Sequence, residues 1–348
     1  MKGRGNRAML VRAAAVAVLA VLPLSGCFAA PPVPLATETP ALPVVDYQEP
    51  EPTEVAPLRG TTVPAGSLNR PALSAKIDDH EAARPQAGLE RADIVVEELV
   101  EGGLTRYVAV WHSDLPDLIG PVRSIRPMDP DIISPFGGIV AYSGGQEIFV
   151  EMMQGTGLYN AVHGDVDTQD TFFRAEGREA PHDVLVHAPQ LVAEHLDLAA
   201  PAPQFPFALD AGSSSAAKEG QPVSRIDVAF SSSRYPSWLW DPARAQYLRF
   251  QEGDPDLDTA GVQLGAVNAV VLRVAIDWTY GSVPRTVLTG TGEAWVSTGG
   301  GTLHGTWTKE SAAAPITLTD DRGFPLRLGA GNTWIELLPE DGTIAFTP

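Results

Sequence analysis

The second half of this sequence restricts the possible fold most strongly, because its apolar residues occur only in short stretches separated by turn residues. Examples after residue 223 are AQYLRFQ, NAVVLRVAIDW, GEAWVS and NTWIELL, and Gly, Pro, Asp and Ser are frequent between them. Such stretches, rich in Val, Ile, Leu and aromatic residues, are typical of β-strands joined by turns. The pattern predicts that residues 223–348 form a smaller, mostly antiparallel, β-rich C-terminal domain.

Residues 61–196 show a different pattern, in which predicted strands and helices alternate. The stretch 92–111 (ADIVVEELVEGGLTRYVAVW) reads as two strands around a glycine turn, which predicts a hairpin. The stretches 137–157 and 181–196 each read as a strand followed by a helix. This alternation predicts an α/β N-terminal domain. Residues 197–222, rich in Pro, Ala and Ser, are predicted to be a linker or a long loop between the two domains.

The N-terminus has the pattern of a secretory signal. Four basic residues precede the apolar run AAAVAVLAVLPL at 13–24, and the small residues of SGC follow it. The segment LSGC resembles a bacterial lipobox, which predicts a signal peptide over 1–26 and fatty acyl chains, such as palmitate, on Cys27. Cys27 is the only cysteine. Residues 27–60 then combine this lipidated residue with a Pro-rich extended tether.

The charge of the chain bears on its partners. The formal net charge is −19, and residues 1–26 carry basic but no acidic side chains, so a processed chain would be more acidic still. Such a surface repels nucleic acid and anionic lipid headgroups. We therefore expect no nucleic-acid partner, and a contact with the membrane through the lipidated cysteine, on the extracytoplasmic face of the cell membrane.

Several segments together carry a resemblance to a known family. These are KIDDHEAARPQAGLERADIVVEELVEGGLTRYVAVW, IGPVRSIRP, FFRAEGREAPHDVLV and the late GTWTK and NTWIELL. They resemble the YerB-like bacterial lipoproteins, a domain of unknown function, over about residues 64–346. The resemblance implies an α/β domain followed by a smaller β-rich domain, and a membrane-anchored protein of the cell envelope. It implies no enzymatic activity. The chain departs from the family at Asp183, where Asn is frequent, and at Asp256, where His is frequent.

Arginines in the first domain are the first candidate site. Arg123 and Arg126 lie on the proline-bracketed segment GPVRSIRP, while Arg84 and Arg106 adjoin turn signals. Guanidinium groups bind carboxylate and phosphate in a bidentate manner, so these four residues could line an anion pocket, as could Arg174. The alternative is that they neutralise nearby acids inside the fold. Those acids are Asp78, Asp79, Glu97, Glu98 and Glu101.

A glycine turn is the second candidate. The segment YSGGQE ends a predicted strand and begins a predicted helix. Backbone amides at such a position can hold an anion, which makes Ser143, Gly144 and Gly145 candidate ligand-binding residues. The simpler interpretation is a tight turn without a ligand. The Gly-x-Ser-x-Gly spacing of a nucleophile elbow is absent.

Two residues are candidates for acid–base catalysis. On a strand through 94–101, Glu98 shares its side with Ile94 and Val96, so it points to an apolar face and needs a partner or a raised pKa. It could be a general acid or base, or it could pair with an arginine. His182, in the PH motif, could act with a nearby glutamate, or it could be structural.

Metal and cofactor signals are weak. Asp78, Asp79 and His80 could ligate a metal ion, but a solvated turn is the simpler interpretation. No metal and no cofactor are expected.

Two functions remain open at this point. The first, which the tether and the arginine segment favour, is a lipoprotein that binds an anionic envelope component or an envelope protein, in a binding or scaffolding role. The second is a cell-envelope hydrolase that acts on a glycan or a phosphodiester with Glu98 and His182. Whether the protein is an enzyme is left undecided by the sequence.

Overall fold

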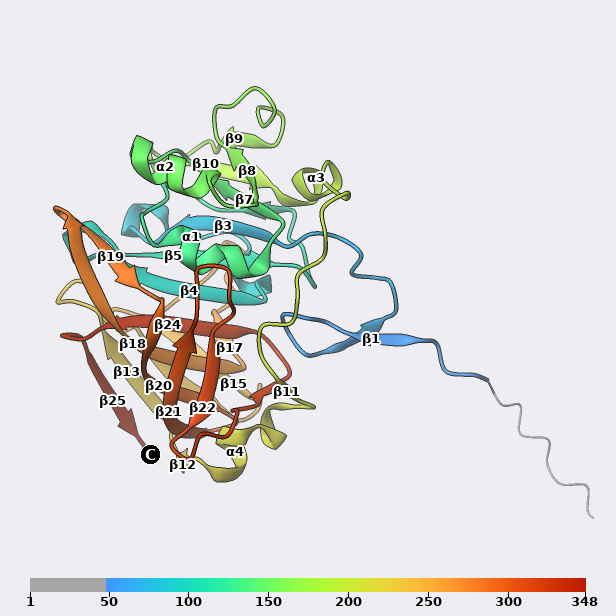
Figure 1. Cartoon of the computed structure of the whole chain (residues 1–348), viewed down its shortest axis with the longest axis vertical. Coiled ribbons are helices and arrows are strands. Elements are labelled where there is room, and N and C mark those ends of the chain that lie inside the picture. The colour runs from blue at the N-terminus through green and yellow to red at the C-terminus, as the bar shows by residue number, and fades with distance from the viewer. Residues whose placement is uncertain (1–47) are drawn as a thin grey trace, which may run out of the picture. The chain divides into compact units, whose positions relative to one another are not determined.

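The computed structural model describes residues 48–348 (Figure 1). The predicted signal peptide, Cys27 and most of the tether lie outside the described residues. Among those described, no helix combines the length and the apolar character that a membrane crossing requires.

The main element is a twelve-stranded mixed sheet that contains strands from both halves of the chain. Strands β4 and β24, from opposite halves, lie side by side and are parallel, with Glu97 opposite Glu336. The order along the sheet is β12 (Gln221–Pro222), β21 (Gly301–Lys309), β20 (Gly290–Thr298), β18 (Asn268–Tyr280), β24 (Thr333–Pro339), β4 (Ile94–Leu99), β5 (Thr105–Trp111), β3 (Leu73–Asp78), β7 (Ile139–Tyr142) and β8 (Tyr159–Val162), with β19 (Val283–Val287) paired to β18 and β22 (Thr317–Asp320) to β21.

A second sheet of six strands comes entirely from the C-terminal half and is antiparallel. Its order is β16 (Asp254–Pro255), β15 (Gln246–Gln251), β14 (Ser237–Asp241), β13 (Arg225–Ala229) and β25 (Thr343–Thr347), with β17 (Gly265–Ala266) paired to β15. Three small sheets complete the strands: β1 (Thr53–Val55) with β2 (Thr62–Pro64), β6 (Leu118–Ile119) with β10 (Val184–His187) and β9 (Phe172–Arg174), and β11 (Phe207–Ala208) with β23 (Leu328–Gly329).

The helices are few and short. The longest, α2, has eight residues and ends where Gly155 follows. Helix α1 is followed directly by the 3-10 turn η4, in which Ser134, the residue before Pro135, keeps helical backbone angles. The α-helices are α1 (Asp129–Ile133), α2 (Glu147–Gln154), α3 (Ala188–Ala193) and α4 (Ser215–Glu219), and the 3-10 turns are η1 (Glu81–Ala83), η2 (Leu89–Arg91), η3 (Glu101–Gly103), η4 (Ser134–Phe136) and η5 (Ala211–Ser213).

The fold-class prediction is therefore confirmed only at its coarser level. The C-terminal half is rich in strands, and the hairpin predicted over 92–111 is β4 and β5. The N-terminal half, predicted to be α/β, is also built mainly on strands, and its helices are short. Residues 197–222 contain β11, η5, α4 and β12, and so contribute two strands that pair with β23 and β21.

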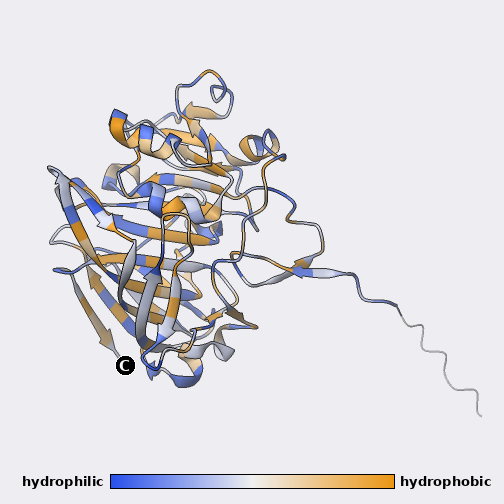
Figure 2. Cartoon of the chain, viewed as in Figure 1, coloured by the Kyte–Doolittle hydropathy of each residue, from blue (hydrophilic) through white to orange (hydrophobic). Residues whose placement is uncertain are grey.

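The large sheet separates two apolar clusters, and apolar residues are spread along the strands of both sheets (Figure 2). Successive residues of β4 alternate between them: Val95 and Leu99 pack in one cluster, Ile94 and Val96 in the other. All six residues of β4 are buried as a result. Two of these six residues are the glutamates Glu97 and Glu98, so on each face of this strand a buried carboxylate needs a neutralising partner.

Strand direction gathers polar residues at one edge of the large sheet. Strands β24 and β4 are parallel, and β3, β7 and β8 are parallel. Strand β5 lies antiparallel between β4 and β3, so all five others end at the same edge. Ligands of open sheets commonly bind beyond the carboxyl ends of parallel strands, which makes this edge the place to examine.

Candidate functional site

The edge carries two polar clusters, one on each face of the sheet. In the register of the strands, Arg106 lies opposite Asp78 on one side and opposite Glu98 on the other. Side chains paired in this way share a face. The neighbouring residues Asp79 and Thr105 point to the other face. We call Asp78, Glu98, Arg106, Arg123 and Arg126 the arginine cluster. We call Asp79, Thr105 and the side chains bonded to Asp79 the Asp79 network.

Arg123 and Arg126 each contact one carboxylate. The Arg123 Nε lies 3.0 Å from Asp78 Oδ2. The Arg126 Nε donates to Glu101 Oε2 at 2.8 Å, and its Nη1 donates to the Ile125 carbonyl at 2.9 Å. Their side chains are 20% and 12% exposed, so both reach the surface. Ion pairing, the alternative to an anion pocket, thus accounts for part of the role of these two residues.

Arg106 differs from them, because no carboxylate of residues 48–348 lies within ion-pair distance of it. The residue is 8% exposed. Its Nη1 donates to the Ser124 carbonyl at 2.7 Å. Burial, followed by the charges of Arg126 and Arg123, lowers its pKa to about 10. This buried guanidinium lies beside two others and is held by a carbonyl alone, so it has no carboxylate partner among the described residues.

The glycine turn lies directly against the arginine segment. The Ser143 amide donates to the Arg123 carbonyl at 3.0 Å, and the Ile125 amide donates to the Gly144 carbonyl at 3.1 Å. The Ser143 amide is therefore already engaged and is not free to bind a ligand. Gly144 has a φ of +66°, and Gly145 lies close to Ile125. The geometry of the turn therefore accounts for glycine at both positions without a bound anion. Their role as anion ligands stays a prediction.

His182 forms a dyad with Asp78. Its Nδ1 lies 2.6 Å from Asp78 Oδ2, the oxygen that also faces Arg123. The ring of His80 stacks on that of His182 with 4.5 Å between centroids and 21° between planes. The segment before His182 is fixed because Arg178 donates to the Ala83 carbonyl at 2.7 Å. The sequence suggested a glutamate as the partner of His182, whereas the structure places Asp78 against it.

Glu98 points to the expected face and is fully buried, but its partner is Lys76, which is also fully buried. Lys76 Nζ also donates to Asp129 at 2.8 Å. Burial lowers the pKa of Lys76 to about 8, against the opposing effect of Asp129. The sequence considered only arginines as partners, and the lysine two residues before Asp78 on the same strand face was missed. Glu98 is therefore part of an internal ion pair with Lys76.

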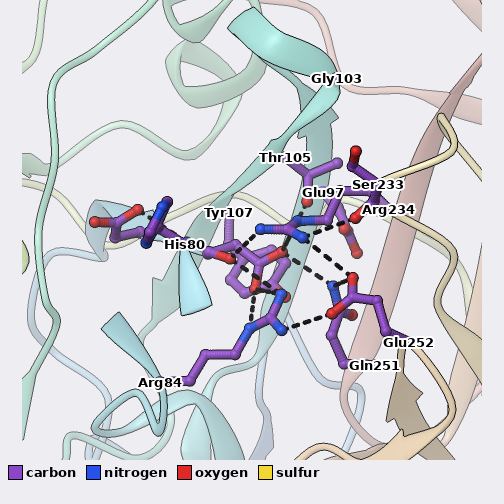
Figure 3. A network of polar contacts seen from close by, with 12 residues as sticks. His80, Arg84, Glu97, Gly103, Thr105, Tyr107, Ser233, Arg234, Gln251 and Glu252 are labelled. Carbon is purple, nitrogen blue, oxygen red and sulfur yellow. Dashed lines mark hydrogen bonds and ion pairs between the residues drawn. The ribbon is translucent and has the colours of Figure 1, made fainter. Parts of the chain in front are cut away.

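Arg84 belongs to the Asp79 network on the opposite face (Figure 3). Its Nε donates to Asp79 Oδ1 at 3.1 Å and its Nη1 to Glu252 Oε2 at 2.7 Å. Thr105 Oγ1 donates to Asp79 Oδ2 at 2.8 Å, and Arg234 Nη2 to the Asp79 carbonyl at 2.9 Å. The structure does not bring Arg84 to the arginine cluster. Asp78 and Asp79 are buried, so the prediction of a solvated turn at 78–80 was wrong.

A further buried group, which no sequence pattern indicated, lies beside this network. Arg249 is fully buried and ion-paired to Glu97, with Asp256 Oδ2 at 3.3 Å and the Trp334 ring centroid 4.7 Å away. Glu336 accepts from Trp238 Nε1 at 2.9 Å. Burial and the neighbouring Glu97 raise the pKa of Glu336 well above its ordinary value. The sequence of strand β15 is amphipathic, and this pattern does not indicate that Arg249 points into the protein.

A cleft of about 700 Å³ adjoins the arginine cluster. It is lined by η3, by the turns after β13 and β24, and by Trp278, which is 56% exposed. Glu101 connects the two sites, since it lines the cleft and accepts from Arg126. Within residues 48–348 no group of three or more His, Cys, Asp or Glu residues is arranged to hold a metal ion.

Comparison with known proteins gives consistent results. Residues 58–199 match the N-terminal domain, and residues 226–335 the C-terminal domain, of a protein of unknown function (DUF3048). The chain is 32% identical over 128 residues to "Putative lipoprotein YerB" of Bacillus subtilis (strain 168), an alignment that spans 37% of this chain and 38% of that relative. The crystal structure of the YerB protein from Bacillus subtilis matches with a TM-score of 0.71 and 21% identity, over 84% of this chain and 99% of that one. The structural match establishes a shared fold.

Proposed function

This chain belongs to the DUF3048 family, whose description assigns no activity, and from the geometry of its own residues we propose that it is a binding protein whose arginine cluster holds an anionic group. The ligand is a phosphate or carboxylate carried by a component of the bacterial cell envelope or by an envelope protein. Lipidation of Cys27 would anchor the protein at the extracytoplasmic face of the membrane. The name of the Bacillus relative, a lipoprotein, supports the anchor.

The observation that carries this proposal is the missing partner of Arg106. Three guanidinium groups meet at the cluster, whereas two carboxylates, Asp78 and Glu101, contact them. Arg106 is thus the one guanidinium group of the three without a carboxylate contact among the described residues, in a chain with a net charge of −19. An anion between the guanidinium groups would give Arg106 the charged hydrogen-bond partner that a buried arginine requires. Proline at 121 and 127 limits the freedom of the segment, which reduces the entropy lost on binding.

The test is thermal unfolding of the protein with and without phosphate. A ligand that binds only the folded state raises the unfolding temperature. At a ligand concentration one hundred times the Kd, the free energy of unfolding increases by about 2.7 kcal/mol. We expect phosphate to stabilise the parent, and we expect Arg106→Gln to abolish that response. Arg244→Gln is the matched control, because the Arg244 side chain is 56% exposed and lies in the turn between β14 and β15 of the second sheet.

The stability of Arg106→Gln without phosphate makes the test sharper. Because Arg106 has no carboxylate partner and faces two like charges, its replacement should leave the unfolding temperature unchanged or raise it. An unresponsive parent, combined with a large loss of stability in the variant, would assign Arg106 to the fold and refute the proposed function.

A further inference from the structure

The orientation of His182 leaves one of its ring nitrogens free. Asp78 Oδ2 accepts from Nδ1 at 2.6 Å, and an ionised carboxylate can only accept, so the neutral ring carries its proton on Nδ1. Nε2 is then unprotonated. No hydrogen bond or ion pair joins this nitrogen to any residue of the described chain. The side chain is 15% exposed, so water can reach it.

The surroundings hold this histidine in one position. The other oxygen of Asp78 accepts from the His80 amide at 3.1 Å, which fixes the carboxylate. The stacked His80 ring fixes the plane of His182, and Arg178 holds the preceding segment. A carboxylate that orients an imidazole while the opposite nitrogen stays free is the arrangement of a general base.

The dyad adjoins the arginine cluster. The same Asp78 oxygen contacts His182 and Arg123, and Asp78 lies opposite Arg106 in the strand register. Asp78 therefore joins the His182 dyad directly to the arginines that would hold the anion. We propose that His182, oriented by Asp78, is the general base that hydrolyses a phosphodiester bound at the arginine cluster. This inference rests on the proposed function, since the arginines must first hold the anion.

The chemistry of the ligand follows from what the two groups need. A bound carboxylate offers no electrophile to water, whereas a phosphodiester offers both a negative charge for the arginines and an electrophilic phosphorus. His182 Nε2 takes a proton from water, the water oxygen bonds to phosphorus, and one phosphorus–oxygen ester bond breaks. The leaving alkoxide takes its proton from solvent, and His182 returns its own to solvent. The products are a phosphomonoester and an alcohol, and the arginines neutralise the charge on the non-bridging oxygens.

The experiment measures the release of 4-nitrophenolate from bis(4-nitrophenyl) phosphate, a diester whose leaving group needs no acid. General-base catalysis contributes typically 10²–10⁴-fold, so His182→Gln should lower kcat by at least about 100-fold. His304→Gln, at an exposed histidine bonded to Asp321, should match the parent. Asp78 is a positioning residue, so Asp78→Asn should lower kcat without raising KM. A merely structural defect would instead raise KM and lower the unfolding temperature.

The outcomes separate this inference from the proposed function. Phosphate stabilisation of the parent without turnover above His182→Gln would overturn the hydrolysis and leave the binding function standing. If phosphate does not stabilise the parent and no diester turnover is detected, both the binding function and the hydrolysis are refuted. Turnover of the monoester 4-nitrophenyl phosphate alone would refute the diester as the substrate class. Diester turnover that depends on His182, with phosphate binding unchanged in His182→Gln, supports the proposal.

Discussion

Two buried arginines in this protein have opposite electrostatic surroundings. Arg249 contacts Glu97 and Asp256 and lies over the rings of Tyr107 and Trp334, and its pKa is raised well above the ordinary value by its acidic neighbours. Burial, followed by the two neighbouring guanidinium groups, lowers the pKa of Arg106. The same side chain therefore stabilises the fold at one site and leaves a charge unmatched at the other.

Replacement of Arg249 should be costly for this reason. Arg249→Gln would leave the buried Glu97 without its cation, and breaking such a buried pair costs about 3–5 kcal/mol. Urea unfolding of the variant and of Arg106→Gln would compare the two sites directly. Equal stability losses in the two variants would contradict the distinction drawn between them.

Asp256 gives the fold a dependence on pH. Burial raises its pKa to about 6, although Arg249 opposes the shift. A carboxyl group with a raised folded pKa adds stability below its unfolded pKa, and that contribution is lost as the pH rises through about 6. Relative to Asp256→Asn, the parent should therefore lose roughly 2–3 kcal/mol between pH 4 and pH 6. Urea unfolding of both proteins across this range measures the difference, and a constant difference would be inconsistent with a buried, titrating Asp256.

At the level of elements, β4 shows how far the sequence could be interpreted. Its pairing with β5 is a local hairpin, and the alternation that turns Glu98 to an apolar face needs only the strand period. Both were predictable for that reason. The burial of Glu97 was not, because it depends on β24 and on Arg249 of β15, which the chain brings in from the far half. Arg123 and Arg126 were identified from their segment, whereas the unmatched state of Arg106 follows from the three-dimensional arrangement alone.

The pairing of β4 with β24 also makes the halves depend on each other. Residues 48–222 alone would expose the β24-facing edge of β4 and leave Glu97 without Arg249. We expect this fragment to show no cooperative unfolding transition, and we expect the same of residues 223–348. Circular dichroism during heating checks both fragments. A cooperative transition in the first fragment would show that the N-terminal part is an independent domain.

For the whole molecule, the central question is its attachment to the membrane. The basic start, the apolar run and the sequence LSGC predict lipidation of Cys27. Cys27→Ala should remove the acyl anchor and move the protein from the membrane fraction to the soluble fraction of a bacterial host. Fractionation followed by immunoblotting detects the change. Complete retention of the variant in membranes, with the signal cleaved, would refute the lipid anchor.

The central position of β24 has a consequence for the time at which the protein becomes folded. The strand comprises residues 333–339 of 348, yet it lies between β18 and β4 in the large sheet. During synthesis the N-terminal residues emerge first, and the second neighbour of β4 does not exist until residues 333–339 have been made. Contacts this distant in sequence form slowly. Until the last strands arrive, Glu97 lacks the neighbours that later bury it, so the polar edge of the sheet, with any ligand site it holds, is among the last parts of the molecule to be completed.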